Sequence, residues 1–287
     1  MRDADYAYIK DRVSLLARRP DISKYDNGRC LLLAGSFGMA GAAVMAGRAA
    51  LRSGCGLLTY LTDREIIPIL QQSLPEAMAK PADGDIDISK YDAALCGPGF
   101  LGPDSARLTE KMIAGFEGTL VLDAEALNII TRNDLFPLVR ERAAKGWQTV
   151  LTPHEGEAAR LLGAKSADVK ADREGAAAKL RDKTDSVVVL KGPGTITAAP
   201  GHQGEAPEMI RNTTGGAGLA KGGSGDVLGG MTASFAAQGL TAFDAAVCAV
   251  YIHGLAGDAA CRDKGIISMM PTDTVETLPY VIKGMFE

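Results

Sequence analysis

Short apolar segments that alternate with helical patterns constrain the fold of this chain more than any other feature. Six segments indicate buried strands, and two further extended segments flank a turn at Pro200-Gly201. Strands that alternate with helices form a mostly parallel sheet with helices on both faces, so the expected fold class is α/β. The six strands span residues 29–34, 56–61, 93–96, 119–122, 147–151 and 187–190, and the two extended segments span 195–198 and 208–211.

The chain shows no internal repeat and no stretch with the composition of a linker. Its 287 residues are enough for one large domain. The core of that domain is expected to be aliphatic and rich in alanine, because 46% of the residues are hydrophobic and only 5% are aromatic. We therefore expect a single domain over residues 1–287.

Residues suited to ligand binding follow five of the predicted strands. The parallel strands of an α/β sheet end at one edge, and ligands bind in the crevice beyond their carboxyl ends. The sequence therefore predicts a binding site at that edge. The residues at the five strand ends are Gly35, residues 97–99, Asp123, residues 152–154 and Lys191.

A glycine-rich stretch at residues 212–230 leads into a helical pattern, in which Val227, Met231 and Phe235 recur four residues apart. A flexible linker is disfavoured, because a buried-looking helix follows at once. The glycine spacing ahead of Lys221 also does not fit a Walker A phosphate loop. The stretch is therefore expected to form a loop at the N-terminus of a helix.

This loop has the residues of an anion site with a base at its mouth. Glycine lets backbone amides approach a ligand closely, and amides ahead of a helix bind anions. Gly223, Ser224 and Gly225 are expected to form the anion hole. A carboxylate beside it, that of Asp226, suits a general base that deprotonates a hydroxyl group attacking a phosphate.

Three other residues at the predicted edge have two interpretations each. Lys191 either binds a nucleotide phosphate, which its glycine neighbours favour, or is a surface lysine at a turn. His154 either hydrogen-bonds substrate as a neutral imidazole or satisfies the backbone of its loop. Asp123 is expected to cap the next helix through the amide of Glu125; the alternative is that it holds a metal-bound water.

Composition excludes several classes of function. A net charge of −4 gives no reason to expect nucleic acid or an anionic membrane as partner. The N-terminus has no apolar signal-peptide region, and the longest apolar stretch is too short to span a bilayer. An odd number of widely spaced cysteines indicates buried free thiols in the reducing cytoplasm and argues against a zinc site. These cysteines are Cys30, Cys55, Cys96, Cys248 and Cys261.

Six stretches, in order over nearly the whole chain, resemble the NAD(P)H-hydrate dehydratases, the ribokinase-like family that repairs hydrated nicotinamide cofactors. The Thr-Pro-His and Asp-Ala-Glu-Ala-Leu-Asn stretches are the most specific. The six are Leu33-Ala-Gly-Ser-Phe-Gly-Met-Ala-Gly-Ala, Gly97-Pro-Gly, Asp123-Ala-Glu-Ala-Leu-Asn128, Thr152-Pro-His-Glu-Gly-Glu157, Leu190-Lys-Gly-Pro-Gly-Thr195 and Gly222-Gly-Ser-Gly-Asp226.

The resemblance implies a ribokinase-like three-layer α/β/α sandwich and a repair reaction. The enzyme would act on the S epimer of NADHX or NADPHX, nicotinamide cofactors with water added to the ring. It would transfer phosphate from ADP or ATP to the ring hydroxyl, and elimination of phosphate would restore NADH or NADPH. Mg²⁺ would come with the nucleotide. A separate epimerase would supply the S epimer, and the enzyme would be a homo-oligomer, for example a tetramer.

The resemblance also implies roles for individual residues. Asp226 matches the base and contacts the hydrate, and Ala40, Gly99 and His154 match the other substrate-contacting positions. The positions that match the nucleotide-binding stretch are Lys191, Gly192, Pro193, Gly194, Thr195 and Gly225.

Three residues depart from the family pattern, and a second function shares the same motifs. Glu125 stands where the motif has aspartate, Glu155 where proline is common and Gly229 where threonine is common. The alternative function is that of a ribokinase-like kinase acting on a vitamin or sugar hydroxyl, because such an enzyme would use the same glycine loop and base.

Overall fold

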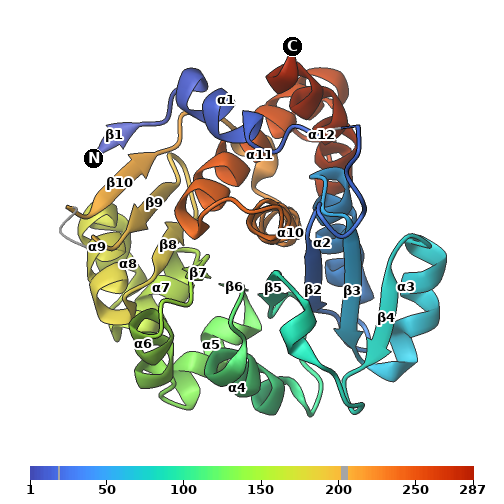
Figure 1. Ribbon diagram of the computed structural model, residues 1–287. Coiled ribbons are helices and arrows are strands. Elements are labelled where there is room, and N and C mark those ends of the chain that lie inside the picture. The colour runs from blue at the N-terminus through green and yellow to red at the C-terminus, as the bar shows by residue number, and fades with distance from the viewer. Residues whose placement is uncertain (19, 202–205) are drawn as a thin grey trace.

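The computed structural model describes residues 1–18, 20–201 and 206–287, and the strands of these residues form one ten-stranded sheet. Their order across the sheet is β1-β10-β9-β8-β7-β6-β5-β2-β3-β4 (Figure 1). They are β1 (Arg2–Asp3), β2 (Arg29–Leu33), β3 (Leu57–Thr62), β4 (Met78–Pro81), β5 (Ala93–Cys96), β6 (Thr119–Leu122), β7 (Thr149–Leu151), β8 (Val187–Leu190), β9 (Ile196–Ala199) and β10 (Glu208–Arg211).

Neighbouring strands are parallel throughout the sheet, except where β9 pairs antiparallel with β8 and with β10. The predicted mostly parallel α/β sheet is therefore confirmed. The predicted strands agree with the observed ones to within two residues at each end. The sequence reasoning missed β1 and β4, two short strands at the two edges of the sheet. An edge strand has a partner strand on one side only and is more exposed, so it does not need the apolar run by which buried strands are recognised.

Helices occupy the connections between the strands. They are α1 (Tyr6–Ser14), α2 (Ala40–Arg52), α3 (Ile67–Ser73), α4 (Ser105–Gly115), α5 (Glu125–Arg132), α6 (Phe136–Ala144), α7 (Glu155–Leu162), α8 (Ser166–Ala171), α9 (Arg173–Thr184), α10 (Ser224–Ala237), α11 (Ala242–Lys264) and α12 (Pro271–Phe286), with 3-10 turns η1 (Arg64–Ile66), η2 (Ile88–Lys90) and η3 (Ala217–Leu219). Helices α4, α6, α8 and α12 were not predicted.

The helices cover both faces of the sheet, which gives the expected α/β/α layering (Figure 1). One face carries α1, α2, α3, α10, α11 and α12, and the other carries α4 to α9. The side chains of β2 alternate between the two cores, because Cys30 and Leu32 pack on the first face and Leu31 and Leu33 on the second. A strand buried on both faces has a continuous apolar sequence, as this one does.

Helix α10 lies over the middle of the sheet, against β2, β5 and β6, and packs along α2. Two glycines permit this close packing. A Cβ at Gly230 would lie 2.0 Å from the carbonyl oxygen of Ala46, and a Cβ at Gly229 would lie 3.0 Å from Leu95 Cδ1. The glycine at 229, where the resembling family commonly has threonine, therefore fits the close contact between this helix and β5.

A fully buried arginine, Arg142 of α6, ties three segments of the second face together. Its guanidinium donates hydrogen bonds to the carbonyl oxygens of Phe116, Gly118 and Gln148 and to Thr149 Oγ1. Burial lowers the pKa of Arg142 to about 10. This side chain satisfies carbonyls at the end of α4 and at the starts of β6 and β7 that would otherwise be buried without donors.

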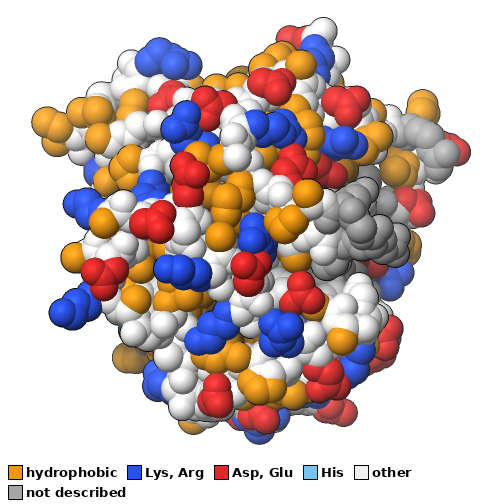
Figure 2. Space-filling view, turned by 90° about the vertical axis from the view of Figure 1, so that its left-hand side faces the viewer, with side chains coloured by type: hydrophobic (Ala, Val, Ile, Leu, Met, Phe, Trp, Pro, Cys, Tyr) orange, Lys and Arg blue, Asp and Glu red, His pale blue; other side chains and the backbone are white. Residues whose placement is uncertain are grey.

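The surface near the N-terminus mixes both signs of charge. Figure 2 shows acidic and basic side chains interspersed on the side of the molecule that carries β1 and β10. At this edge Arg2 pairs with Glu208 and Arg211 pairs with Asp3. Among the residues that the structure describes, no helix is both long and apolar enough to cross a lipid bilayer. Four of the five cysteines are buried, as predicted, and Cys261 is half-buried.

Candidate active site

Asp226 lies in the first turn of α10 and is partly buried. Burial and, to a smaller extent, the negative charge of Asp123 raise the pKa of its carboxyl group, the positive charge of Lys191 lowers it, and the net result is a pKa of about 7. The helix begins at Ser224, three residues earlier than the predicted start at Val227. Asp226 is therefore part of the helix rather than of the loop before it, and it titrates near neutral pH.

The N-terminus of α10 presents unpaired donors beside Asp226. Gly223 adopts φ 104°, in the left-handed region that favours glycine, and turns the chain into the helix. Within the described residues, the backbone amides of Gly225 and Asp226 have no acceptor, and Ser224 Oγ is buried without a hydrogen-bond partner. The backbone amide of Ser224, a residue predicted to form the anion hole, is not free to bind an anion, because it donates a hydrogen bond to the carbonyl of Lys221. Its hydroxyl remains available in place of its amide.

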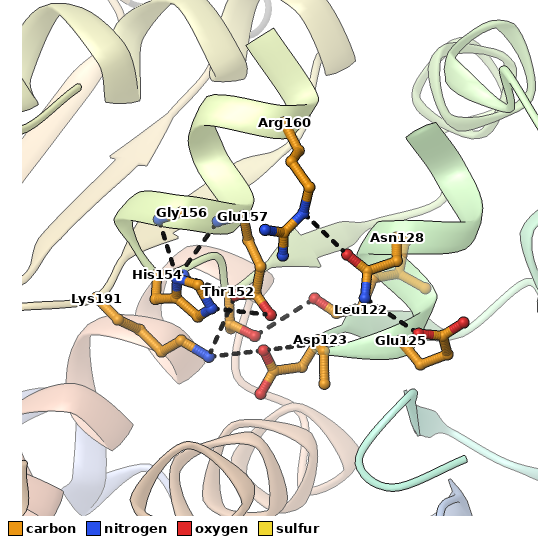
Figure 3. A network of polar contacts seen from close by, with 11 residues as sticks. Leu122, Asp123, Glu125, Asn128, Thr152, His154, Gly156, Glu157, Arg160 and Lys191 are labelled. Atoms are coloured by element: carbon orange, nitrogen blue, oxygen red, sulfur yellow. Dashed lines mark hydrogen bonds and ion pairs between the residues drawn. The ribbon is translucent and has the colours of Figure 1, made fainter. Parts of the chain in front are cut away.

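Lys191 and Asp123 form a partly buried ion pair near this helix end (Figure 3). Nζ of Lys191 lies 2.7 Å from Oδ1 of Asp123 and 4.0 Å from Oε2 of Glu157. A Cβ at Gly225 would lie 3.2 Å from the same Nζ, so the lysine reaches the glycine loop. Burial by itself lowers the pKa of Lys191, but the attraction of Asp123 and Glu157 outweighs it, and the pKa is raised. Lys191 is thus not a free surface lysine.

The predicted helix-capping role of Asp123 is wrong. Its Oδ1 accepts hydrogen bonds from the amide of the next residue, Ala124, and from Lys191, and it makes no side-chain cap of α5. Ala124 adopts φ 48° and ψ −116°, an unusual conformation for a residue with a side chain, which marks backbone strain at this strand end. A Cβ at Gly97 would lie 1.8 Å from the carbonyl of Asp123, so the neighbouring strand end packs directly against this turn.

His154 caps helix α7, although the sequence predicts Thr152 as the cap residue, because a proline, which is common at the first helical position, follows it at 153. Its Nδ1 accepts hydrogen bonds from the amides of Gly156 and Glu157, and the carboxylate of Glu157 in turn accepts a hydrogen bond from the amide of His154 (Figure 3). An Nδ1 that accepts two bonds leaves the ring proton on Nε2. That nitrogen lies 3.6 Å from Glu157 Oε1, and 56% of the side chain is exposed. Backbone capping is thus established, and the exposed ring remains accessible to a ligand.

Glu125 belongs to a separate polar network. It accepts hydrogen bonds from Asn128 Nδ2 and Arg132 Nη2. The side-chain oxygen of Asn128 accepts a bond from Arg160, and Figure 3 shows this contact together with the bond from Asn128 to Glu125. These contacts join α5 to α7. Of the two acidic residues in the Asp123–Asn128 stretch, it is Asp123 that contacts Lys191. The glutamate in place of aspartate at this position therefore has a structural explanation.

Ala40 and Gly99 come together at the start of α2. Ala40 is the first residue of that helix, and a Cβ at Gly99 would lie 3.0 Å from Met39 Cβ. Ser36 Oγ donates to the carbonyl of Gly99, which fastens the loop after β2 to the loop after β5. The same helix, α2, also contacts the glycine loop, because a Cβ at Gly223 would lie 2.6 Å from the Sδ of Met45. The predicted convergence of strand ends on one edge is therefore observed.

The segment 191–195 is the hairpin loop between β8 and β9. Its Gly192 and Gly194 adopt φ 140° and φ 59°, and Thr195 Oγ1 donates to the carbonyl of Gly192. The amide of Lys191 donates to the carbonyl of Pro153, which joins this loop to the segment before α7. The loop is therefore held next to His154 and Glu157.

The sequence profile of the family described as NAD(P)H-hydrate dehydratase matches residues 30–280. The chain belongs to the NAD(P)H-hydrate dehydratase family. The match includes every residue predicted for the site, from Ala40 to Asp226. The strand ends that converge at one edge of the sheet therefore lie within the part of the chain that matches the family.

Curated relatives of this dehydratase-family chain include proteins of similar length and bifunctional proteins about twice as long. The ADP-dependent (S)-NAD(P)H-hydrate dehydratase of Neisseria meningitidis serogroup B is 37% identical, over 87% of this chain and 83% of that protein. The bifunctional NAD(P)H-hydrate repair enzyme of Moorella thermoacetica is 36% identical, over 91% of this chain but only 50% of that protein. The chain spans about half the length of such bifunctional relatives.

Solved structures confirm the ribokinase-like fold. The ADP/ATP-dependent NAD(P)H-hydrate dehydratase of Bacillus subtilis, co-crystallised with ATP and Mg²⁺, matches with a TM-score of 0.83 and 28% identity, over 99% of this chain and 98% of that one. A ribokinase-like superfamily protein of Enterococcus faecalis matches with a TM-score of 0.83 and 26% identity, over 99% and 96% of the two chains. A hydroxyethylthiazole kinase of Pyrococcus horikoshii, at 16% identity, shares the fold alone.

Proposed function

We propose that this chain dehydrates the S epimer of NADHX or NADPHX to NADH or NADPH, with ADP or ATP as phosphate donor. The observation that carries the proposal is the position of Asp226, a carboxylate with a pKa of about 7 beside open helix amides and next to Lys191. Relatives of similar length bear the name of this activity. The kinase alternative rests on fold alone, because the matching vitamin kinase is only 16% identical.

Asp226 is the general base of the first step. Near neutral pH a large share of its carboxyl groups is ionised and still basic enough to take a proton, which suits proton transfer at physiological pH. It accepts the proton of the ring hydroxyl, whose oxygen forms a bond to the terminal phosphorus of the nucleotide. The bond from that phosphorus to its bridging oxygen breaks, and the shortened nucleotide leaves.

The second step removes the phosphate that has been added. The phosphorylated carbon lies next to the ring nitrogen, whose lone pair expels phosphate. Loss of a proton from the neighbouring carbon then restores the dihydropyridine. Phosphate is a far better leaving group than hydroxide, which is why nucleotide is consumed in a net dehydration.

The phosphate groups would be held by the donors around the start of α10. The amides of Gly225 and Asp226 and the hydroxyl of Ser224 are the open donors, and the helix dipole favours an anion there. Lys191, whose raised pKa keeps it positive, supplies the cation. Together with Lys191 and Gly225, the segment Gly192, Pro193, Gly194 and Thr195 is proposed to bind the nucleotide.

The acidic residues near Lys191 fit Mg²⁺ that arrives with the nucleotide. Protein carboxylates commonly hold this ion one or two at a time, together with substrate phosphates and water. Asp123 and Glu157 would hold it, and it would neutralise charge that develops on the phosphate oxygens. Within the described residues, no group of three or more His, Cys, Asp or Glu side chains could hold a metal ion through protein ligands alone.

The hydrate is proposed to contact Ala40, Gly99, His154 and Asp226. Small side chains at the first two positions leave space, and the exposed Nε2 of His154 can donate a hydrogen bond. The chain is further proposed to act as a single-domain homo-oligomer in the cytoplasm. A separate epimerase is proposed to convert the R epimer to the S epimer.

One assay tests the function. Chemically prepared S-NADHX is incubated with the protein, Mg²⁺ and either ADP or ATP, and the products are followed by nicotinamide absorbance and mass spectrometry. The expected products are NADH and inorganic phosphate in equal amounts, with ADP at least as effective as ATP. Accumulation of a stable phosphorylated hydrate, or phosphorylation of a vitamin alcohol without turnover of NADHX, would instead support the kinase.

A further inference from the structure

Arg173 is a largely buried arginine to which the proposed reaction assigns no role. It is the first residue of α9, and only 16% of its side chain is exposed. Its Nη1 donates a hydrogen bond to the carbonyl of Pro193, and its Nη2 donates one to the carbonyl of Leu190 over 3.1 Å. One guanidinium group therefore bridges the residue before the hairpin loop 191–195 and a residue within it.

Glu155 forms an ion pair with the third nitrogen of the Arg173 guanidinium group. Nε of Arg173 lies 3.6 Å from Oε1 of Glu155, the first residue of α7. This Nε is buried and has no hydrogen-bond acceptor among the described residues, so the ion pair is the interaction that orients it. Burial lowers the pKa of Arg173, and the charge of Glu155 raises it. A proline at position 155, which is common in the family, has no carboxylate for this contact.

The hairpin loop needs such support because of its composition. Gly192 and Gly194 hold left-handed conformations and lose much conformational freedom when they are fixed. A Cβ at Gly192 would lie 2.9 Å from Arg173 Nη2, so the guanidinium packs directly on the loop backbone. A loop that is ordered before its ligand arrives binds more tightly, because less entropy is lost on binding.

We propose that Arg173 is a positioning residue for the nucleotide and that Glu155 orients it. Arg173 holds the 191–195 loop in the conformation that receives the nucleotide, and it does so through backbone carbonyls rather than by touching the ligand. The inference rests on the proposed assignment of this loop to nucleotide binding. It also gives Glu155 a role, in that the residue links the cap of α7 to the loop after β8.

The first test measures binding of ADP with Mg²⁺ by calorimetry, without any hydrate present. In Arg173→Met the dissociation constant is expected to rise by about tenfold, the factor that corresponds to losing one hydrogen bond to a charged group. Arg173→Lys is expected to recover only part of the loss, because an ammonium group cannot bridge both carbonyls in the same fork.

Glu155→Pro tests the orienting carboxylate separately. Proline is well tolerated at the first position of a helix, and the preceding His154 is extended, as a residue before proline prefers. This variant is expected to fold normally and to weaken ADP binding by a smaller factor than Arg173→Met. It keeps the proposal testable even where Arg173→Met folds poorly.

Arg140→Met is the matched control. Arg140 also donates to two backbone carbonyls, those of Asp182 and Lys183, but at the opposite end of α9. Its replacement is expected to leave ADP binding unchanged. In turnover assays, the KM for ADP is expected to rise in Arg173→Met while the KM for the hydrate stays within twofold of wild type, a split that general loosening of the fold does not produce.

The outcomes separate the two proposals. Equal ADP affinity in wild type, Arg173→Met and Glu155→Pro would overturn the positioning role while leaving the dehydratase function intact. A wild-type protein that binds neither ADP nor ATP would overturn the proposed function and, with it, this inference. Equal rises in the KM values for ADP and hydrate would also contradict a role confined to the nucleotide loop.

Discussion

Lys191 donates a hydrogen bond from Nζ to Oδ1 of Asp123 over 2.7 Å, although the two residues lie 68 positions apart in the chain. The pair stands between the glycine loop and the cap of α7, and the charges of both residues act on Asp226. A partly buried lysine is held by one carboxylate next to a second carboxylate of raised pKa, and this arrangement determines how the site responds to pH.

Asp226→Asn should abolish activity and stabilise the fold at the same time. The rate is expected to fall by about 10²- to 10⁴-fold, the usual contribution of a general base. The folded pKa of about 7 lies above the ordinary value of 3.8. The stabilisation from protonation is therefore complete below pH 3.8 and is lost as the pH rises through 7.

At pH 8 the carboxylate of Asp226 is charged and partly buried, which lowers the free energy of unfolding of the wild-type protein; asparagine carries no such charge. The melting temperature of Asp226→Asn at pH 8 is therefore expected to exceed that of wild type by several degrees, and the difference should disappear near pH 4. Calorimetry at the two pH values measures this. Turnover close to that of wild type would remove Asp226 from the role of base.

Asp123→Asn should move the acidic limb of the pH–rate profile. The negative charge of Asp123 raises the pKa of Asp226, so its removal lowers that pKa. The limb of kcat/KM, which reports the free enzyme, is expected to shift to lower pH even if the maximum rate falls. Profiles between pH 5 and pH 9 test this. Asp83→Asn, at an exposed residue that pairs with Arg64, is the control, and an unshifted limb in Asp123→Asn would contradict the coupling.

Gly225→Val should weaken nucleotide binding by crowding Lys191. Glycine-rich loops often contain residues of positive φ, where a side chain would be strained, but Gly225 is not in that region, whereas Gly215 and Gly223 are. The added Cβ would instead lie 3.2 Å from Lys191 Nζ. ADP affinity by calorimetry is expected to fall by about tenfold or more, equivalent to about 1.4 kcal/mol. Gly222→Ala, where a Cβ meets no atom within 4 Å, should bind normally.

Arg142→Met should destabilise the fold without altering the site directly. Removal of the guanidinium leaves several buried carbonyls without donors, at about 1–3 kcal/mol for each unsatisfied group, so a loss of at least about 3 kcal/mol is expected. Denaturant unfolding measures it. Arg140→Met, on an exposed face of the same helix, should change stability by less than about 1 kcal/mol. Equal stability of the two variants would contradict the structural role of Arg142.

Local sequence rules failed at the strand ends that form the site. Asp123 has the position of a helix cap, yet it binds Lys191 instead, and His154 takes the capping role predicted for Thr152. Glu157, three residues after His154, was not singled out, although that spacing is itself a sign of a capping box. Arg173 gave no local signal, because its partners lie in loops that reach it only in the folded chain.

The sequence by itself determined the layers of the fold, the edge that carries the candidate site and the placement of Asp226 next to the start of a helix. These properties follow from local periodicity, from the glycines and from the rule that parallel strands end at one edge. Only the tertiary structure decided the pairing of Lys191 with Asp123, the pKa of Asp226 and the attachment of Arg173 to the hairpin loop. Each of these depends on burial and on distances between residues far apart in the chain, which no local pattern encodes.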